Sequence, residues 1–448
     1  MKKILTFVLA LIIMIVPIFG TYASAKFDSL MKETLYSKIY ILANTDNGSV
    51  VLSKNADKKN QCPALNKIMT VAVALNKNTD LDKKIKITQK MLDSVGSLYS
   101  VTIRLKVGEK ISLRSLLYAA MVQGANDACA AIAVATSGSV EEFMKEVNSY
   151  IASLGCKNTN LVNPTGFDAD GQYTTASDIA KIMADVIKSP VFMDIFSTKS
   201  YKLAATNSSS ERTLISTNKM LFYTVPDYYY SYTTGGKTGA TDESGYCMIS
   251  TATKDGYTYV AVTMQGEVKN VSRNGYKYSE KNTAMFDCKT MFMWAFSNIR
   301  FKVVANTTQI VSVVDVAAGK ESDHVSLVPA NEVSALVPYL VDADGVLIEP
   351  LKDTMPEEIY APVKKGEKIC EARILYAGEE IGQVDLVAAE NIGLSVPRLI
   401  AEKIKDVLTS KVFIAVLLIL LALIIIYIIF VIADNIKSKK NRIHIVGR

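Results

Sequence analysis

Residues 246–264 read YCMISTATKDGYTYVAVTM, and this stretch decides the fold class. Tyr246–Ala252 and Tyr257–Met264 alternate around Lys254-Asp255-Gly256. Alternation with a period of two on both sides of a glycine-containing turn is typical of a β-hairpin. The sequence therefore predicts two adjacent antiparallel strands here.

The chain before this hairpin contains a second hairpin and buried helices. Ile39–Leu42 and Ser49–Leu52 flank a turn at Asp46-Asn47-Gly48. Ile68–Leu75 and Leu113–Ala135 are rich in Ala, Leu and Met, which favours buried helices. Strands, then helices, then strands predict an α/β (α+β) domain over residues 26–300, in which helices pack an antiparallel sheet.

After Arg300 the sequence changes to short β-rich runs separated by turn residues. Thr308–Val316 and Ala335–Val341 are two such runs, and Lys364-Lys365-Gly366-Glu367 marks a turn. This pattern predicts a small all-β domain over residues 301–394. A length of 448 residues is enough for both domains, at roughly 150 residues each.

The net charge of +6 is located at the two ends of the chain. Lys2 and Lys3 contribute +2, and the residues after Ala433 contribute +4, so the chain between them is neutral. This distribution gives no support for a nucleic-acid partner.

Both ends carry membrane signals. Residues 1–25 have a basic start, an apolar run and Ala23-Ser24-Ala25, which is the pattern of a cleaved secretory signal peptide; a retained signal-anchor is the alternative. An amphipathic segment, 395–411, leads into the uncharged run 412–432, which at about 1.5 Å per residue is long enough to cross a bilayer. The basic segment 433–448 should stay in the cytoplasm. We therefore expect a single-pass cell-membrane protein whose main domains are extracellular.

The histidines and cysteines exclude several kinds of chemistry. The only histidines are His324 and His444, so a Ser-His-Asp or Cys-His hydrolase site is not expected. The cysteines are scattered without a CxxC spacing, so we expect no metal site and no cofactor. Most of them should be small buried residues. The six are Cys62, Cys129, Cys156, Cys247, Cys288 and Cys370.

Three short motifs carry the functional signal. They are Lys67-Ile68-Met69-Thr70, Gly124-Ala125-Asn126-Asp127 and Lys237-Thr238-Gly239, in that order. With Asn163-Pro164-Thr165-Gly166-Phe167 between the last two, the sequence resembles the serine-type D-alanyl-D-alanine carboxypeptidases, the low-molecular-mass penicillin-binding proteins. The resemblance extends over essentially the whole chain, and its β-domain looks like the C-terminal domain of that family.

The resemblance implies a mechanism without histidine. A serine three residues before a lysine attacks the peptide bond between two D-alanines of a peptidoglycan stem peptide, and that lysine, here Lys67, takes its proton. A Ser-x-Asn motif, here ending in Asn126, delivers a proton to the leaving amine. A Lys-Thr-Gly strand, here Lys237, Thr238 and Gly239, binds the terminal carboxylate.

This chain departs from the family pattern at both serines. The nucleophile position is Ala64 and the Ser-x-Asn position is Gly124. Loss of a serine nucleophile costs on the order of 10⁶ in turnover. We therefore expect a pseudoenzyme that binds stem peptides, a wall-synthesis partner or a β-lactam-like ligand without covalent reaction.

Two other functions stay open. One is an active D-Ala-D-Ala carboxypeptidase with a non-standard nucleophile, for which Cys62 is the candidate although Pro63 separates it from the face of Lys67. The other is a non-enzymatic scaffold. The tyrosine-rich loop 223–232 either contacts ligand or packs the loop, whereas Asp127 and Thr70 are predicted to make core contacts.

Overall fold

The computed structural model describes Phe27 and residues 31–95, 101–340 and 345–445. The predicted signal peptide, residues 1–25, lies outside the described residues. The chain divides into two compact units. The first extends to Lys302 and also contains 335–345 and 376–381, and the second contains 303–334, 346–375 and the chain from Gly382 onward.

A five-stranded antiparallel sheet forms the centre of the first unit, in the order β2-β1-β9-β8-β7. Both predicted hairpins are confirmed, as β1–β2 and β8–β9. β7 lies at one edge, and its Gly239 is paired with Cys247 of β8. The strands are β1 (Ile39–Asn44), β2 (Val50–Lys54), β7 (Thr233–Thr241), β8 (Gly245–Lys254) and β9 (Tyr257–Gly266).

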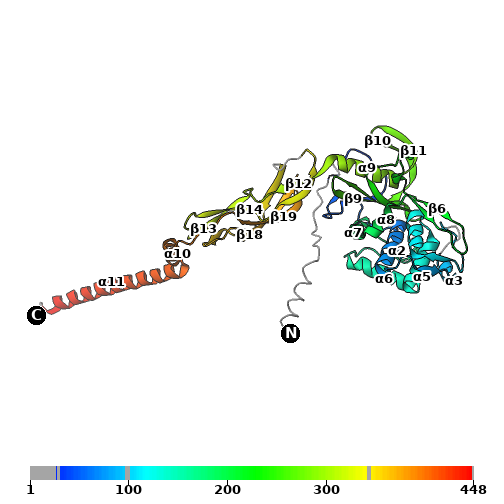
Figure 1. The fold of residues 1–448 in the computed structure, drawn as a ribbon. Helices are drawn as coiled ribbons and strands as arrows, with labels where there is room; N and C mark the ends of the chain where they lie inside the picture. Colours follow the sequence, from blue (N-terminus) through cyan, green and yellow to red (C-terminus); the bar gives the residue numbers. More distant parts are fainter. Residues whose placement is uncertain (1–26, 28–30, 96–100, 341–344, 446–448) are drawn as a thin grey trace. The chain divides into compact units, whose positions relative to one another are not determined.

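Helices cover both faces of this sheet, with α9 on one side of β9 and α2, α7 and α8 on the other (Figure 1). The helices are α2 (Pro63–Lys77), α3 (Gln89–Asp93), α4 (Leu113–Tyr118), η2 (Ala119–Gln123), α5 (Asn126–Ser137), α6 (Val140–Ser153), α7 (Ala176–Val186), α8 (Pro190–Ser197), η3 (Lys219–Leu221) and α9 (Thr283–Asn298). Three short strand pairs complete the unit: β3 (Lys84–Lys86) with β4 (Lys110–Ser112), β5 (Ser200–Leu203) with β6 (Arg212–Ile215), and β10 (Val268–Arg273) with β11 (Tyr276–Asn282).

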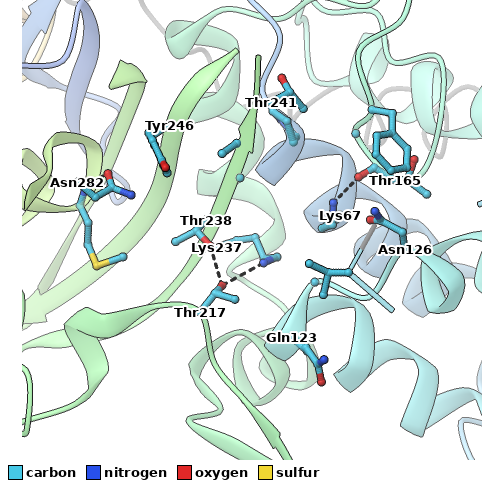
Figure 2. Close-up of a pocket in the computed structure, with 18 of the residues that line it drawn as sticks. Lys67, Gln123, Asn126, Thr165, Thr217, Lys237, Thr238, Thr241, Tyr246 and Asn282 are labelled. Carbon is cyan, nitrogen blue, oxygen red and sulfur yellow. Dashed lines mark hydrogen bonds between the residues drawn. The ribbon is translucent and has the colours of Figure 1, made fainter. Parts of the chain in front are cut away.

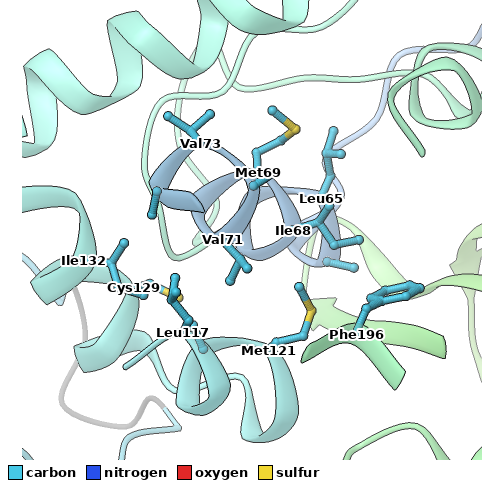
Figure 3. Packing of buried hydrophobic residues seen from close by; sticks show 14 of the residues in the cluster. Leu65, Ile68, Met69, Val71, Val73, Leu117, Met121, Cys129, Ile132 and Phe196 are labelled. Carbon is cyan, nitrogen blue, oxygen red and sulfur yellow. The ribbon is translucent and has the colours of Figure 1, made fainter. Parts of the chain in front are cut away.

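The period-two pattern of the strands produces two hydrophobic cores. Ile41 and Val262 face α2 and its neighbours, whereas Leu42 and Ala261 belong to the core beneath α9. Figure 3 shows α2 surrounded by apolar side chains from α4, η2, α5 and α8. Because α2 is packed in this way, its first turn is held firmly against the sheet.

The predicted helical stretch Leu113–Ala135 is not continuous. It contains α4, one turn of π-helix in η2, a break at Gly124-Ala125, and then α5. Gly124 ends η2 with φ +81°, a left-handed conformation that glycine adopts without steric cost. The break matters because it places the second motif at a junction between helices and not inside one.

The second unit contains a six-stranded sheet in the order β16-β18-β19-β14-β13-β17, as expected for an all-β domain. Its strands are β13 (Ser312–Ala317), β14 (His324–Pro329), β16 (Val346–Pro350), β17 (Glu358–Tyr360), β18 (Lys368–Tyr376) and β19 (Glu379–Ala388). Two further strands, β12 (Ile299–Ala305) and β15 (Val333–Pro338), each contain residues of both units.

Two helices end the chain. α10 (Val396–Thr409) lies within the predicted amphipathic segment 395–411, and α11 (Lys411–Ile445) contains the predicted span. Within α11, Lys411–Ala433 is long and apolar enough to cross a membrane.

Candidate functional site

A cavity of about 430 Å³ lies where the three motifs meet in the first unit. Its walls come from the first turn of α2, the break before α5, the loop around Thr165, the edge strand β7 and the start of α9. The predicted site residues that line it are Lys67, Gly124, Asn126, Lys237, Thr238 and Gly239. The fold therefore brings together residues that are separated by more than 100 positions in the sequence.

Lys67 lies one turn into α2, which begins at Pro63. Proline suits the first position of a helix because it has no N–H to satisfy there. The Lys67 side chain is buried, and its Nζ donates a hydrogen bond to the carbonyl oxygen of Thr165 (Figure 2). Burial lowers the pKa of Lys67, and nearby thiols act weakly in the opposite direction.

Ala64 is fully buried and does not line the cavity. It is close to Gly239 of β7. A Cβ atom built on this glycine would lie only 2.6 Å from the backbone nitrogen of Ala64. Only glycine allows the strand to approach the helix this closely. The chain thus keeps the tight seam between α2 and β7, but the position offers a methyl group and no reactive atom.

Gly124 lies close to the side chains of both Lys67 and Lys237. A Cβ built on it would lie 3.1 Å from Nζ of Lys237 and 3.7 Å from Cε of Lys67. A side chain at position 124 would therefore stand between the two amines. Without one, nothing at this position offers a hydroxyl to either amine.

Asn126 begins α5 and lines the cavity. Its backbone nitrogen donates to the carbonyl oxygen of Val101, and its side-chain Oδ1 is buried without a hydrogen-bond partner among the described residues. A buried acceptor without a partner is costly, so a hydrogen-bond donor reaching Oδ1 would be stabilising. The neighbouring Asp127 accepts from the backbone nitrogens of Ile103 and Leu105, which confirms the prediction of a core hydrogen bond.

The edge strand β7 carries Lys237 and Thr238. Nζ of Lys237 lies 3.4 Å from Oγ1 of Thr217, and Thr238 Oγ1 donates to the same oxygen at 2.6 Å. Burial, followed by repulsion from Lys67, lowers the pKa of Lys237 to about 7. Within the described part of the chain, no carboxylate pairs with either lysine, so the cavity can accept an anionic group.

Several cavity residues were not predicted as site residues. Thr165 belongs to the Asn163–Phe167 motif but had no predicted role of its own. The other unpredicted lining residues are Thr217, Tyr246, Asn282 and Met285. The tyrosine-rich loop shows both kinds of contact. Tyr228 lines the cavity, whereas the rings of Tyr230 and Tyr232 pack against Phe296 of α9.

Cys62 lies behind the cavity wall. It is 1% exposed and does not line the cavity, and its pKa is raised by a hydrogen bond to Cys247 and by burial. A thiol in this place has no path to a bound peptide. Thr70 is also buried and donates to the backbone oxygens of Asn66 and Pro164, as expected for a core residue.

Two family matches cover most of the chain. Residues 26–268 match the family described as D-alanyl-D-alanine carboxypeptidase. Residues 301–393 match the C-terminal domain of penicillin-binding protein 5. The first match alone covers more than half of the 448 residues.

Curated relatives align over most of the chain. D-alanyl-D-alanine carboxypeptidase DacF of Bacillus subtilis is 29% identical over 397 residues, which cover 88% of this chain and 95% of the relative. D-alanyl-D-alanine carboxypeptidase DacA of Escherichia coli K12 is 26% identical over 373 residues, which cover 79% of this chain and 83% of the relative.

Solved structures show the same fold. Penicillin-binding protein 5 of Haemophilus influenzae aligns with a TM-score of 0.60 and 22% identity over 81% of this chain and 99% of the other. The carboxypeptidase DacD of Francisella tularensis aligns with a TM-score of 0.63 and 19% identity over 83% and 99%. With the motif residues gathered at one cavity, these matches show that the chain belongs to the D-alanyl-D-alanine carboxypeptidase family of low-molecular-mass penicillin-binding proteins.

Proposed function

We propose that this protein is a receptor for peptides ending in D-Ala-D-Ala, and that it binds them without cleaving them. The observation that carries the proposal is an asymmetry within one cavity. The binding side of the site, with Lys237 and Thr238 on β7 and an unpartnered Asn126 oxygen, is intact. On the reactive side, Ala64 is buried behind the cavity wall and carries only a methyl group, and Gly124 has no side chain.

Each part of the cavity has a binding role in this proposal. The ammonium group of Lys237 and the hydroxyl of Thr238 hold the terminal carboxylate, because charge-assisted hydrogen bonds are the strong ones. The outer edge of β7 adds the peptide as a further strand. Asn126 Oδ1 accepts a hydrogen bond from a peptide N–H of the ligand. Lys67 keeps its place but has no hydroxyl proton to accept.

The loss of chemistry follows from the missing oxygen atom. A methyl carbon cannot form an acyl-enzyme. The remaining binding groups would accelerate hydrolysis at most roughly 10³-fold over the uncatalysed rate. The fold tolerates both changes, since alanine is a strong helix former and Gly124 occupies a left-handed position.

The proposal places the two domains outside the cell. The predicted signal peptide exports residues 26–411, α11 crosses the membrane through 412–432, and the basic tail 433–448 stays in the cytoplasm. In this arrangement the carboxypeptidase-like domain, residues 26–300, and the β-domain, residues 301–394, face the cell wall. The presence of α11 as a long apolar helix supports this placement.

A binding assay on the full-length protein in detergent tests the proposal. A fluorescent stem peptide ending in D-Ala-D-Ala should bind reversibly, with no D-alanine released over hours. Lys237→Ala should weaken binding at least about tenfold, whereas Lys58→Ala, at an exposed lysine, should not. Catalytic release of D-alanine would contradict the proposal, and absent or Lys237-independent binding would favour the scaffold function.

A further inference from the structure

The tyrosine-rich loop 223–232 brings one aromatic side chain to the ligand cavity. Tyr228 lines the cavity together with Asn282, the residue before α9, and it is only 7% exposed. Tyr230 does not line the cavity, and its ring stacks on Phe296 of α9. One tyrosine of the loop therefore packs on the helix, while another forms part of the wall that a ligand meets.

The fold already uses the acceptor capacity of the Tyr228 hydroxyl. The backbone nitrogen of Asn282 donates a hydrogen bond to this oxygen at 2.8 Å. A phenolic hydroxyl also has a hydrogen to donate, and no residue in the part of the chain that the structure describes accepts it. Burial raises the pKa of Tyr228, so the group keeps its proton at neutral pH. The hydroxyl can therefore donate to a bound ligand.

Two further donors lie in the same part of the wall. Lys219 lines the cavity, and its Nζ lies 5.9 Å from the centre of the Tyr228 ring. This lysine is exposed and forms no ion pair with a described residue. The side-chain oxygen of Asn282 accepts from the backbone nitrogens of Ala284 and Met285, which leaves its amide N–H groups. Three neighbouring donors suit an acceptor oxygen of a ligand.

Three cationic side chains fix the loop immediately before its cavity-lining tyrosine. Nζ of Lys281 lies 2.9 Å from a carboxylate oxygen of Asp227. Lys289 donates to the carbonyl oxygen of Pro226 at 2.7 Å, and Arg273 donates to that of Asp227 at 3.0 Å. Hydrogen bonds from charged donors are stronger than neutral ones. These contacts hold the loop against β11 and α9, although none of the three cations lines the cavity with the tyrosine.

We propose that Tyr228 is a ligand-binding residue whose hydroxyl donates a hydrogen bond to a carbonyl or carboxylate oxygen of the bound peptide. Lys281 and Lys289 are positioning residues, because they contact the loop and not the ligand. Lys219 adds a positive charge beside the same oxygen. This inference rests on the proposed receptor function, since it names a further contact between the same cavity and the same peptide.

Peptide affinity of the full-length protein in detergent tests the contact. Tyr228→Phe removes only the hydroxyl group and should weaken binding of the fluorescent D-Ala-D-Ala peptide about 3- to 10-fold. Tyr230→Phe is the matched control, because it removes a hydroxyl of the same loop outside the cavity, and it should bind normally. Equal affinities of Tyr228→Phe and the unaltered protein would overturn the inference and leave the receptor function standing. No binding by the unaltered protein would overturn both.

A second peptide, with a carboxamide in place of the terminal carboxylate, identifies the acceptor oxygen. A loss in Tyr228→Phe that is confined to the carboxylate peptide would assign the contact to the terminal carboxylate. An equal loss with both peptides would assign it to a backbone carbonyl. Both results support the contact, whereas unchanged affinity for both peptides would exclude it.

Double variants test the positioning role, because a residue that acts only through Tyr228 has no further effect once that hydroxyl is gone. Lys281→Met and Lys289→Met should each weaken binding about 2- to 5-fold, and neither should weaken it further in the Tyr228→Phe background. Lys281→Arg, which keeps the ion pair, and Lys277→Met, at an exposed position of β11, should retain affinity. Losses that persist in the Tyr228→Phe background would overturn the positioning role.

Discussion

Gly124 stands against the ammonium group of Lys237, because a methyl group placed on this glycine would lie 3.1 Å from Nζ. A side chain at this position would therefore press on the Lys237 amine and contact Cε of Lys67. Since φ is +81° here, the backbone also prefers glycine.

Replacing this glycine should affect both stability and binding. We expect Gly124→Ala to lower the free energy of unfolding by about 1 kcal/mol or more, because alanine is strained at a positive φ. It should also weaken peptide binding, because the methyl group crowds Lys237. Denaturant unfolding and peptide affinity measure the two effects.

Gly138→Ala is the matched control for this prediction. Gly138 ends α5 with φ +82°, and a Cβ there would meet nothing within 4 Å. It should show the loss of stability and an unchanged affinity. An equal loss of affinity in both variants would mean that crowding at Lys237 is not the cause.

Restoring the nucleophile alone should not restore the enzyme. We expect Ala64→Ser to release D-alanine at least about 100-fold more slowly than an active family member assayed in parallel. General acid–base catalysis contributes a factor of roughly 10²–10⁴ to the rate, and position 124 still offers no hydroxyl group for it. D-alanine release from a stem peptide is the measurement. Turnover comparable to that of the active relative would show that the second serine is dispensable in this chain.

The contribution of Lys237 to the free energy of unfolding should rise with pH above neutrality. The pKa of Lys237 is lowered to about 7 in the folded protein, from an ordinary value of 10.5. Between these values the unfolded chain binds a proton that the folded chain does not, so stability increases with pH, by at most about 1.4 kcal/mol per pH unit for this group. Below pH 7 both states are protonated and the burial penalty is at its largest.

Urea unfolding between pH 6.5 and 9.5 checks this dependence. Lys237→Met should flatten the rise, because it removes the group that gains or loses the proton. Lys58→Met, at an exposed position, should leave the rise unchanged. An unaltered slope in Lys237→Met would mean that another group causes the dependence.

Tyr246, in the cavity wall, should contribute to peptide affinity and not to the stability of the fold. Tyr246 lines the cavity and is 39% exposed. We expect Tyr246→Ala to weaken peptide binding about 3- to 10-fold, through loss of about 1 kcal/mol of aromatic contact. Tyr276→Ala, on the exposed β10–β11 hairpin away from the cavity, serves as the control and should bind normally. Equal affinities in the two variants would exclude Tyr246 from the site.

The sequence was sufficient to predict the two hairpins of the central sheet. Runs such as Tyr257–Met264 alternate because one face of the strand is more buried than the other. A hydrophobic period of two in the sequence therefore indicates such a strand directly. The break at Gly124 was not predicted, because the stretch Leu113–Ala135 is rich in good helix formers and contains no proline. Only the packed structure shows that the chain changes direction there.

Contacts between distant segments were beyond the sequence. Thr217 and Asn282 reach the cavity from a loop and from the end of a strand whose positions depend on tertiary packing. No local pattern marks such contacts, since they arise from the fold as a whole.

Intact-protein mass spectrometry after incubation with a penicillin tests the central claim most directly. The family resemblance implies that a penicillin acylates a serine expected at position 64, where this chain has Ala64. We predict that the mass of the full-length protein stays unchanged after prolonged incubation, while the Ala64→Ser variant is slowly modified. A mass increase equal to one penicillin molecule, located by peptide mapping to a cavity residue of the unaltered protein, would contradict the account.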